Sequence, residues 1–145
     1  MSLFSALSVS ASGMSAQRAR AELLVENLAN AETTRTPEGG PYRRKDVVFS
    51  SEAVSSPFSS VLNAQINAEA TGVGVAEVVT DTRDPERRYL PGHPDADKDG
   101  YVAFPRVNPA EDMVDLMSAT RTYQANVAAV SAVKDMIQRS LDLFR

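Results

Sequence analysis

Residues 95–106, DADKDGYVAFPR, contain part of a calcium-ligand pattern. An EF-hand loop has oxygen ligands at positions 1, 3 and 5 and a glycine at position 6. The residues here at these positions are Asp95, Asp97, Asp99 and Gly100. Position 12 requires a bidentate glutamate, but Arg106 stands there, and Pro94 prevents a helix from running into the loop. The pattern therefore favours an acidic turn that leads into a strand, and a calcium-binding or other helical adaptor module is kept as the alternative hypothesis.

Other catalytic and metal-binding chemistry has few candidate residues. The chain has no cysteine and one histidine, His93, which excludes disulfides, zinc–thiolate sites and cysteine nucleophiles and disfavours a Ser-His-Asp triad. His93 lies in a Pro-Gly-His-Pro turn, where we expect a solvated side chain. We therefore expect no enzyme activity, no cofactor, no metal and no small-molecule substrate.

Composition narrows the classes of partner. The 145 residues carry a net charge of −4, so nothing predicts nucleic-acid binding, which usually needs a clustered basic face. No apolar run reaches the roughly 18 residues of a membrane span. The N-terminus has no basic residue before Arg18 and is interrupted by serines, so we expect no cleaved signal peptide.

Residues 3–30 predict a long helix, about 40 Å at 1.5 Å per residue. Ser2 or Ser5 is the expected cap at its start. Steps of three and four residues give a heptad-like seam, interrupted at Arg18. The seam consists of Phe4, Leu7, Ala11, Met14, Ala21, Val25 and Leu28. Asn30 and the following Gly- and Pro-rich run end the helix.

Residues 109–145 predict a second long helix, with Asn108 as its cap and Pro109 in its first turn. Its seam follows the same three–four spacing for more than four heptads. The seam consists of Met113, Leu116, Thr120, Tyr123, Val127, Val130, Lys134, Ile137, Leu141 and Phe144. A stripe this long needs a second long helix to cover it, and residues 3–30 are the candidate. The alanines outside both seams indicate further helix neighbours in an assembly between chains.

The middle of the chain holds most of the prolines and glycines. Short β-like runs occur at 46–49, 73–80, 87–90 and 101–104. Residues 54–60 are expected to form a loop, and 61–71 fit a helical turn or a further strand equally well.

These elements predict an α+β fold. Two long terminal helices pack as a coiled-coil-like antiparallel pair, with a small, loop-rich β module between them in the chain. The expected division is an N-terminal assembly helix at 1–31, the β module at 32–107 and a C-terminal assembly helix at 108–145.

Three stretches resemble a known family. Ser-Gly-Met at 12–14 followed by Asn-Leu-Ala-Asn at 27–30 is similar to the N-terminal signature of bacterial flagellar axial proteins. Residues 33–45 and the helix start at 107–127 resemble a proximal component of the flagellar basal-body rod. The resemblance covers 1–49 and 95–145, and Glu32 departs from the small polar residue that relatives often have.

The resemblance implies a structural subunit of the proximal rod. Such subunits are exported by the flagellar type III apparatus without a cleaved signal and assemble helically across the periplasm, where the rod transmits torque from the membrane ring to the hook. The implied partners are further copies of the chain, other rod proteins, and membrane-ring and export-gate components. The implied location is the basal body.

The candidate site is thus an assembly interface on the two helices. On the first helix its residues are Leu7, Met14, Arg18, Asn27, Leu28 and Asn30. On the second they are Met113, Leu116, Tyr123, Asn126, Val127, Val130, Ile137 and Leu141. We expect Asn30 to cap the first helix and Asn27 to bond across to a neighbouring helix. For Asn126, a cross-helix hydrogen bond and plain exposure both remain open.

One basic cluster adds a candidate for ion pairing between subunits, and it consists of Arg43, Arg44 and Lys45. Acidic residues such as Glu111, Asp112 and Asp115 are the candidate partners. A solvated basic face is the competing interpretation.

Overall fold

The computed structural model describes residues 3–53 and 71–142. The elements, in chain order, are α1 (Leu3–Ala29), β1 (Lys45–Ala53), β2 (Thr71–Thr80), β3 (Glu86–Tyr89), β4 (Tyr101–Phe104) and α3 (Pro109–Asp142). Long helices at both ends with short antiparallel sheets between them confirm the predicted α+β class. The predictions for Ser2, 54–60, 61–70 and Phe144 lie outside the described residues.

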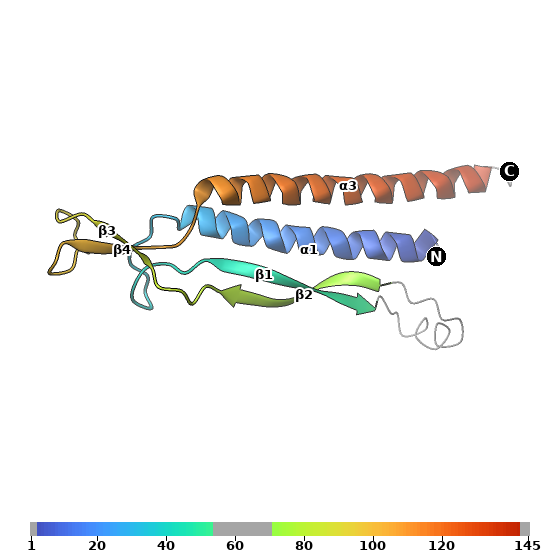
Figure 1. Ribbon diagram of the computed structural model, residues 1–145. Coiled ribbons are helices and arrows are strands. Elements are labelled where there is room, and N and C mark those ends of the chain that lie inside the picture. The colour runs from blue at the N-terminus through green and yellow to red at the C-terminus, as the bar shows by residue number, and fades with distance from the viewer. Residues whose placement is uncertain (1–2, 54–70, 143–145) are drawn as a thin grey trace.

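The elements form three layers, as Figure 1 shows: α3 lies on α1, and α1 lies on the β1–β2 hairpin. The two helices run antiparallel, so that the start of α1 and the end of α3 lie at the same end of the molecule. This confirms the expected antiparallel helix pair. Because α1 is the middle layer, it is covered on two sides, whereas α3 is covered on one.

The β region consists of two separate two-stranded sheets. β1 and β2 pair antiparallel, from Lys45 with Thr80 to Ala53 with Thr71, with an irregularity between Val48 and Phe49. β3 and β4 form a second hairpin that projects beyond the helices in Figure 1. The first hairpin therefore lies along α1 and does not join the second in one compact sheet.

The helix ends follow the capping predicted from sequence. The Asn108 side-chain oxygen accepts a hydrogen bond from the Ala110 amide at 3.2 Å, as an N-cap does. At the end of α1, the Asn30 side-chain amide donates to the Glu26 carbonyl at 2.9 Å. Asn30 therefore closes the last turn through its side chain, as expected of a capping residue.

Few apolar side chains are fully covered in the described residues. The buried apolar set is Ala16, Leu24, Tyr42, Val102, Phe104, Ala119 and Val133. Several large apolar side chains remain exposed on α1, on the first hairpin and on α3. Neither described helix has both the length and the apolar character that a membrane span requires.

The face of α3 that is covered differs from the predicted seam by about one residue. Asp112, Ala119 and Val133 are buried, whereas the seam residues Met113, Val127 and Leu141 are exposed. Leu116, Val130 and Ile137 belong to the predicted seam and are half-buried, so they lie where the seam borders the covered face. The prediction that the whole apolar stripe of α3 packs on α1 is therefore wrong.

Candidate functional site

Asn27 on α1 joins the helix to the first strand. Its side-chain Nδ2 donates to the Lys45 carbonyl at 2.8 Å, and its Oδ1 accepts from the Lys45 amide at 2.9 Å. The same Oδ1 accepts from the Tyr42 hydroxyl at 2.9 Å. Asn27 is fully buried, so all of these bonds are shielded from water. The sequence predicts a bond from Asn27 to a neighbouring helix. That partner is wrong, because the side-chain amide bonds to the strand backbone of its own chain.

The surroundings of Asn27 are polar and closed. Burial, and then Glu26, raise the pKa of Tyr42 to about 12, which keeps the hydroxyl protonated as a donor to Asn27. Lys45 Nζ lies 2.6 Å from the Glu26 carboxylate. We call this group, consisting of Glu26, Asn27, Tyr42 and Lys45, the Asn27 cluster. It fixes the end of α1 to the start of β1.

Ser12 and Gly13, in the first half of α1, also attach this helix to its neighbouring elements. The Ser12 hydroxyl accepts from the Val73 amide of β2 at 3.1 Å and donates to the Val9 carbonyl at 2.8 Å. A Cβ at Gly13 would lie 3.0 Å from Nδ2 of Asn126 on α3. Adjacent residues of α1 thus contact the strand on one side and the second helix on the other.

Asn126 is half-buried and lies against Gly13. This contact places Asn126 between the two helices, so plain exposure, one of the two alternatives, is wrong. A Cβ at residue 13 would make the Asn126 amide shift by a few tenths of an ångström. The close contact favours glycine here, although glycine costs about 1 kcal/mol relative to alanine within a helix.

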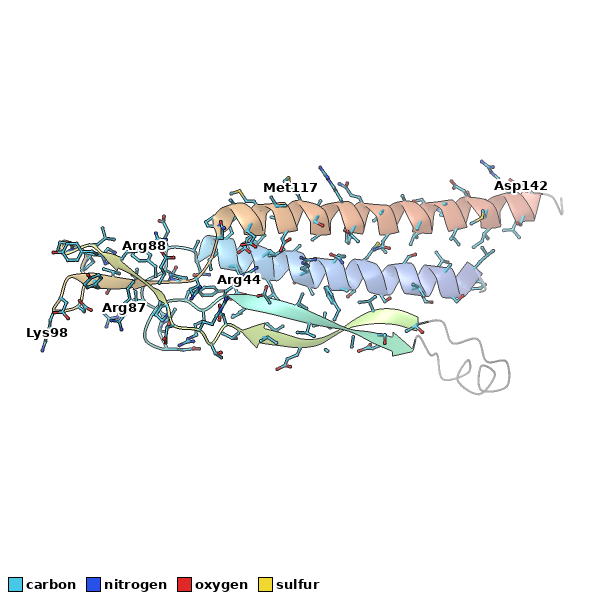
Figure 2. All side chains as sticks on the ribbon, viewed as in Figure 1. Arg44, Arg87, Arg88, Lys98, Met117 and Asp142 are labelled. Carbon is cyan, nitrogen blue, oxygen red and sulfur yellow. The ribbon has the colours of Figure 1, made fainter. Side chains whose placement is uncertain are left out.

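Charged pairs fix the start of α3. Arg44 lies 2.9 Å from Asp112, whose side chain is 1% exposed, and Figure 2 shows Arg44 between the hairpin and the helices. Arg20 of α1 lies 3.3 Å from Asp115. Burial raises the pKa of Asp112, although Arg44 acts in the opposite direction. Within the described residues the second carboxylate oxygen of Asp112 is buried without a hydrogen-bond partner, which agrees with burial as the larger effect.

These contacts show how the expected basic cluster is used within one chain. Arg44 pairs with Asp112, and Lys45 pairs with Glu26. Arg43 donates to the backbone carbonyl of Asp81 at 3.1 Å and makes no ion pair with the described residues. Of the three cations, Arg43 is therefore the one without a carboxylate partner in the described part of the chain.

The remaining candidates of α1 divide between covered and exposed positions. Leu7, Met14 and Leu28 are half-buried. Arg18 is exposed and pairs with Glu22 one turn along the helix at 2.8 Å. The pair is therefore local to α1.

The outward surface of α3 is long and nearly uncharged. Between residues 116 and 133 the sequence has one charged residue, Arg121. Several apolar side chains of the helix are 40–64% exposed, and Figure 2 shows Met117 on the side of α3 that faces away from α1. These side chains are Met113, Val114, Met117, Tyr123, Val127, Met136 and Leu141. Leu141 lies beside Leu3 and Phe4 of α1, and Tyr123 lies near Arg18 of α1. We call the other five the outer face of α3, and two of the residues predicted for the interface, Met113 and Val127, belong to it.

The acidic turn does not gather metal ligands. Asp97 Oδ1 accepts hydrogen bonds from the amides of Asp99 and Tyr101 at 3.0 and 2.8 Å, and Gly100 has a φ of 82°. Asp95 accepts from the Thr34 hydroxyl at 2.8 Å. No group of three or more potential metal-ligating side chains occurs within residues 3–53 and 71–142. The segment is the turn of the β3–β4 hairpin, and nothing found supports calcium binding.

His93 was expected to be solvated, but its side chain contacts the turn. Its Nδ1 accepts from the Asp95 amide at 3.1 Å, and its ring lies 6.3 Å from that of Phe104. The side chain is half-buried and stabilises the turn, so the expectation of a solvated residue is wrong.

Comparisons with known proteins identify relatives along the whole chain. Residues 98–143 match the family model described as the flagellar basal body rod FlgEFG protein C-terminal. The flagellar basal-body rod protein FlgC of Bacillus subtilis is 43% identical over 150 residues, which cover 99% of each chain. The protein of the same name from Borreliella burgdorferi is 38% identical, covering 100% of this chain and 99% of the relative. That of Escherichia coli is 38% identical, with 99% and 98% covered.

Proposed function

This chain belongs to the FlgC family of flagellar basal-body rod proteins, and from this membership we propose that it acts as a structural subunit of the bacterial flagellar rod. The observation that carries the proposal is the outer face of α3. Exposed apolar side chains along a helix whose central stretch, residues 116–133, carries one charged residue favour burial against another protein surface. A rod subunit has such a surface on each copy.

The division of labour within the chain supports this function. The Asn27 cluster and the Arg44–Asp112 pair fix both helices to the first hairpin. The inner side of the helix pair is thereby satisfied within one chain, and the outer face of α3 is left for neighbours. Assembly with further copies and other rod components follows from family membership. The predicted assembly residues of both helices stay a proposal, with the outer-face members as the strongest of them.

The finer parts of the proposal concern route, partners and role. We place the subunit in the proximal rod, exported through the flagellar type III apparatus, with membrane-ring and export-gate components among its neighbours. Helical assembly lets the rod transmit torque to the hook. A structural role needs no catalytic chemistry. Within the described residues, the groups with shifted pKa values, such as Tyr42, Asp81 and Asp112, take part in hydrogen bonds and ion pairs that hold the fold together. No two of them form a nucleophile–base pair in a cleft.

A deletion strain tests the function directly. Without the gene we expect no motility and, by electron microscopy of isolated basal bodies, no rod. Plasmid-borne wild-type protein restores both. Intact rods in the deletion strain would overturn the proposal.

A charge on the outer face tests the surface that carries the proposal. Met117→Glu leaves the helix pair folded, because the side chain faces solvent in the single chain, but places a charge in the assembly contact. We expect loss of rods at normal protein level and unchanged helical content by circular dichroism. Lys98→Glu, at the exposed turn of the β3–β4 hairpin, is the control for the added negative charge. Equal rod assembly by both variants would contradict the outer-face assignment.

A further inference from the structure

A small arginine-lined pocket lies where three segments of the β region meet. Its walls come from the residues before β1, the connection between β2 and β3, and the segment after β4. Four arginines, Arg43, Arg44, Arg83 and Arg106, surround one carboxylate, Asp81. The accessible volume is about 20 Å³, which is room for roughly one water-sized group. A pocket of this size suits a small charged group, and its lining determines the sign of that group.

The ion pairs within the pocket leave two guanidinium groups without a carboxylate. Arg44 is held by Asp112 at 2.9 Å and by Asp46 at 3.4 Å. Arg83 pairs with Asp81 at 2.6 Å. Within residues 3–53 and 71–142, the side chain of Arg43 donates to a backbone carbonyl, and neither Arg43 nor Arg106 makes an ion pair with a carboxylate. Arg43 and Arg106 therefore have no direct carboxylate partner in the described chain, although Arg106 lies near enough to Asp81 and Glu86 to lower their pKa values.

The titration of Asp81 agrees with a local positive potential. Hydrogen bonds from Arg83 lower the pKa of Asp81 to about 2, and the charge of Arg106 acts in the same direction. Such a potential attracts anions. The contrast with the whole chain, which carries a net charge of −4, shows that the arginines are concentrated here.

A carboxylate is the anion that the pocket fits best. A guanidinium presents parallel N–H donors that match the two oxygens of a carboxylate, and Arg–carboxylate pairs are often bidentate. A carboxylate is larger than the water-sized group that the pocket holds, but Arg43 and Arg106 are exposed, so it would contact them at the mouth of the pocket. In a polymer of a chain with more acidic than basic residues, exposed carboxylates of neighbours are also the most abundant anions at close range.

We propose that Arg43 and Arg106 form a carboxylate receptor, which holds an acidic side chain of a neighbouring subunit in the rod. The proposal rests on the proposed function as a rod subunit. It differs from the expected use of Arg44 and Lys45, because those two cations pair within their own chain. It also adds Arg106, which lies 63 positions further along the chain and joins Arg43 through the fold.

Binding is tested on the full-length chain by following arginine side-chain Nε–H signals in NMR spectra. The probe is capped glutamate (N-acetyl-glutamate methylamide), added at constant ionic strength. We expect saturable shifts for Arg43 and Arg106 at least threefold larger than for Arg87, an exposed arginine on β3 without an ion pair in the described chain. Equal shifts at all arginines, or none at Arg43 and Arg106, would overturn the receptor. A stronger response to inorganic phosphate than to capped glutamate would overturn its assignment to carboxylates.

The role in assembly is tested by rod formation in cells. Arg43→Gln combined with Arg106→Gln should reduce intact rods at least tenfold, with export at the wild-type level. Both side chains are exposed, so the melting temperature of the purified variant should match that of the wild type. Arg87→Gln is the matched control and should assemble normally. If the double variant forms normal rods while the deletion strain forms none, the receptor is refuted and the rod function stands. Rods in the deletion strain would instead refute the rod function.

Discussion

Asn27 has the most complete set of hydrogen bonds among the side chains that attach α1. Its amide supplies one donor and one acceptor to the backbone of Lys45, as a neighbouring strand would, and also accepts from Tyr42. Asparagine is suited to this position because its side chain carries a carbonyl and an NH₂ on one carbon. An aspartate could accept the hydrogen bonds from the Lys45 amide and the Tyr42 hydroxyl, but it could not donate to the Lys45 carbonyl.

Asn27→Ala should therefore lower the free energy of unfolding by about 2–4 kcal/mol, since it leaves buried polar groups of Lys45 and Tyr42 without partners. Urea denaturation of the purified chain measures the change. Asn30→Ala is the control, because the Asn30 side chain donates to the Glu26 carbonyl and accepts from the Thr33 hydroxyl at a partly buried position, and a typical hydrogen bond contributes about 1 kcal/mol. Equal losses in the two variants would show that burial of the Asn27 cluster adds nothing.

Two aspartates of the described chain should show opposite pH dependence. The pKa of Asp112 is raised above 3.8 by burial, so its ionisation is less favourable in the folded state, and stability is lost as pH rises through its folded pKa. The pKa of Asp81 is lowered from 3.8 to about 2 by Arg83. Its contribution is present above the unfolded value and is lost as pH falls from about 4 to about 2.

Replacing each aspartate by asparagine isolates its contribution. The stability of Asp112→Asn relative to wild type should rise between pH 3 and pH 7, because the variant has no charge to bury. The stability of wild type relative to Asp81→Asn should fall as pH is lowered from about 4 to about 2. Thermal melts over this range provide both curves. A relative stability of Asp112→Asn that decreases with pH would mean that Arg44 outweighs burial at this site.

The helices show how far periodicity predicts packing. Their existence, their capping by Asn30 and Asn108, and their antiparallel pairing could be predicted, because heptad spacing and capping residues are local signals. The rotation of α3 could not. Small residues and charges, such as Ala119 and Asp112, occupy its covered side. The partner of Asp112, Arg44, lies in another segment of the chain, so no local pattern in α3 marks this side. Hydrophobicity instead marks a face that is exposed in the single chain.

The partner of Asn27 was unpredictable for a related reason. Its bonds reach across 18 positions to a backbone amide and carbonyl, which carry no side-chain signal in the sequence. The arginine pocket shows the same limit, since Arg43 and Arg106 are joined only by the fold. By contrast, the strand positions followed from local β-branched runs, and β4 was predicted at its observed bounds.

Support along α3 is uneven, which predicts a gradient of stability within one helix. Its first half is held by the Arg44–Asp112 and Arg20–Asp115 pairs and by buried Ala119. Beyond Val133, Ile137 is the one half-buried residue up to Asp142. Helical segments with few tertiary contacts open easily, because isolated helices are marginal in water.

Amide hydrogen exchange of the monomer should therefore be at least tenfold faster at 134–142 than at 112–126. Exchange followed by mass spectrometry of overlapping peptides resolves the two segments. In assembled basal bodies the difference should shrink, because neighbours then cover the outer face. Uniform protection in the monomer would show that the pairing with α1 suffices along the full helix.

The three layers raise one question about the whole molecule: whether the helix pair of the single chain persists in the rod. The inner contacts are specific, with Gly13 against Asn126 and Arg20 against Asp115. These contacts join small and polar side chains, whereas the outer face of α3 consists of apolar side chains that could not replace them. We therefore expect neighbours to add to this pair and not to replace it.

A disulfide between the helices distinguishes these alternatives. The Cβ position of residue 13 lies 3.4 Å from Cγ of Asn126. A cysteine sulfur at residue 126 takes roughly the place of this Cγ, so in the pair Gly13→Cys and Asn126→Cys it would lie close to the Cβ of residue 13, as it does in a disulfide. The natural chain has no cysteine, so no other bridge competes. The cytosol keeps thiols reduced, and the bridge forms only in an oxidising compartment such as the periplasm.

If the pair persists, cells with the double-cysteine variant should swim, and purified basal bodies should contain the bridged chain, detected by its gel mobility without reductant. Each single-cysteine variant controls for the substitution itself, since Gly13→Cys alone crowds Asn126. A variant that swims only with added reductant would mean that α1 and α3 separate during assembly. In that case the inner side of α3 would itself become an interface between subunits, and the contacts of Gly13 and Asn126 would belong only to the unassembled chain.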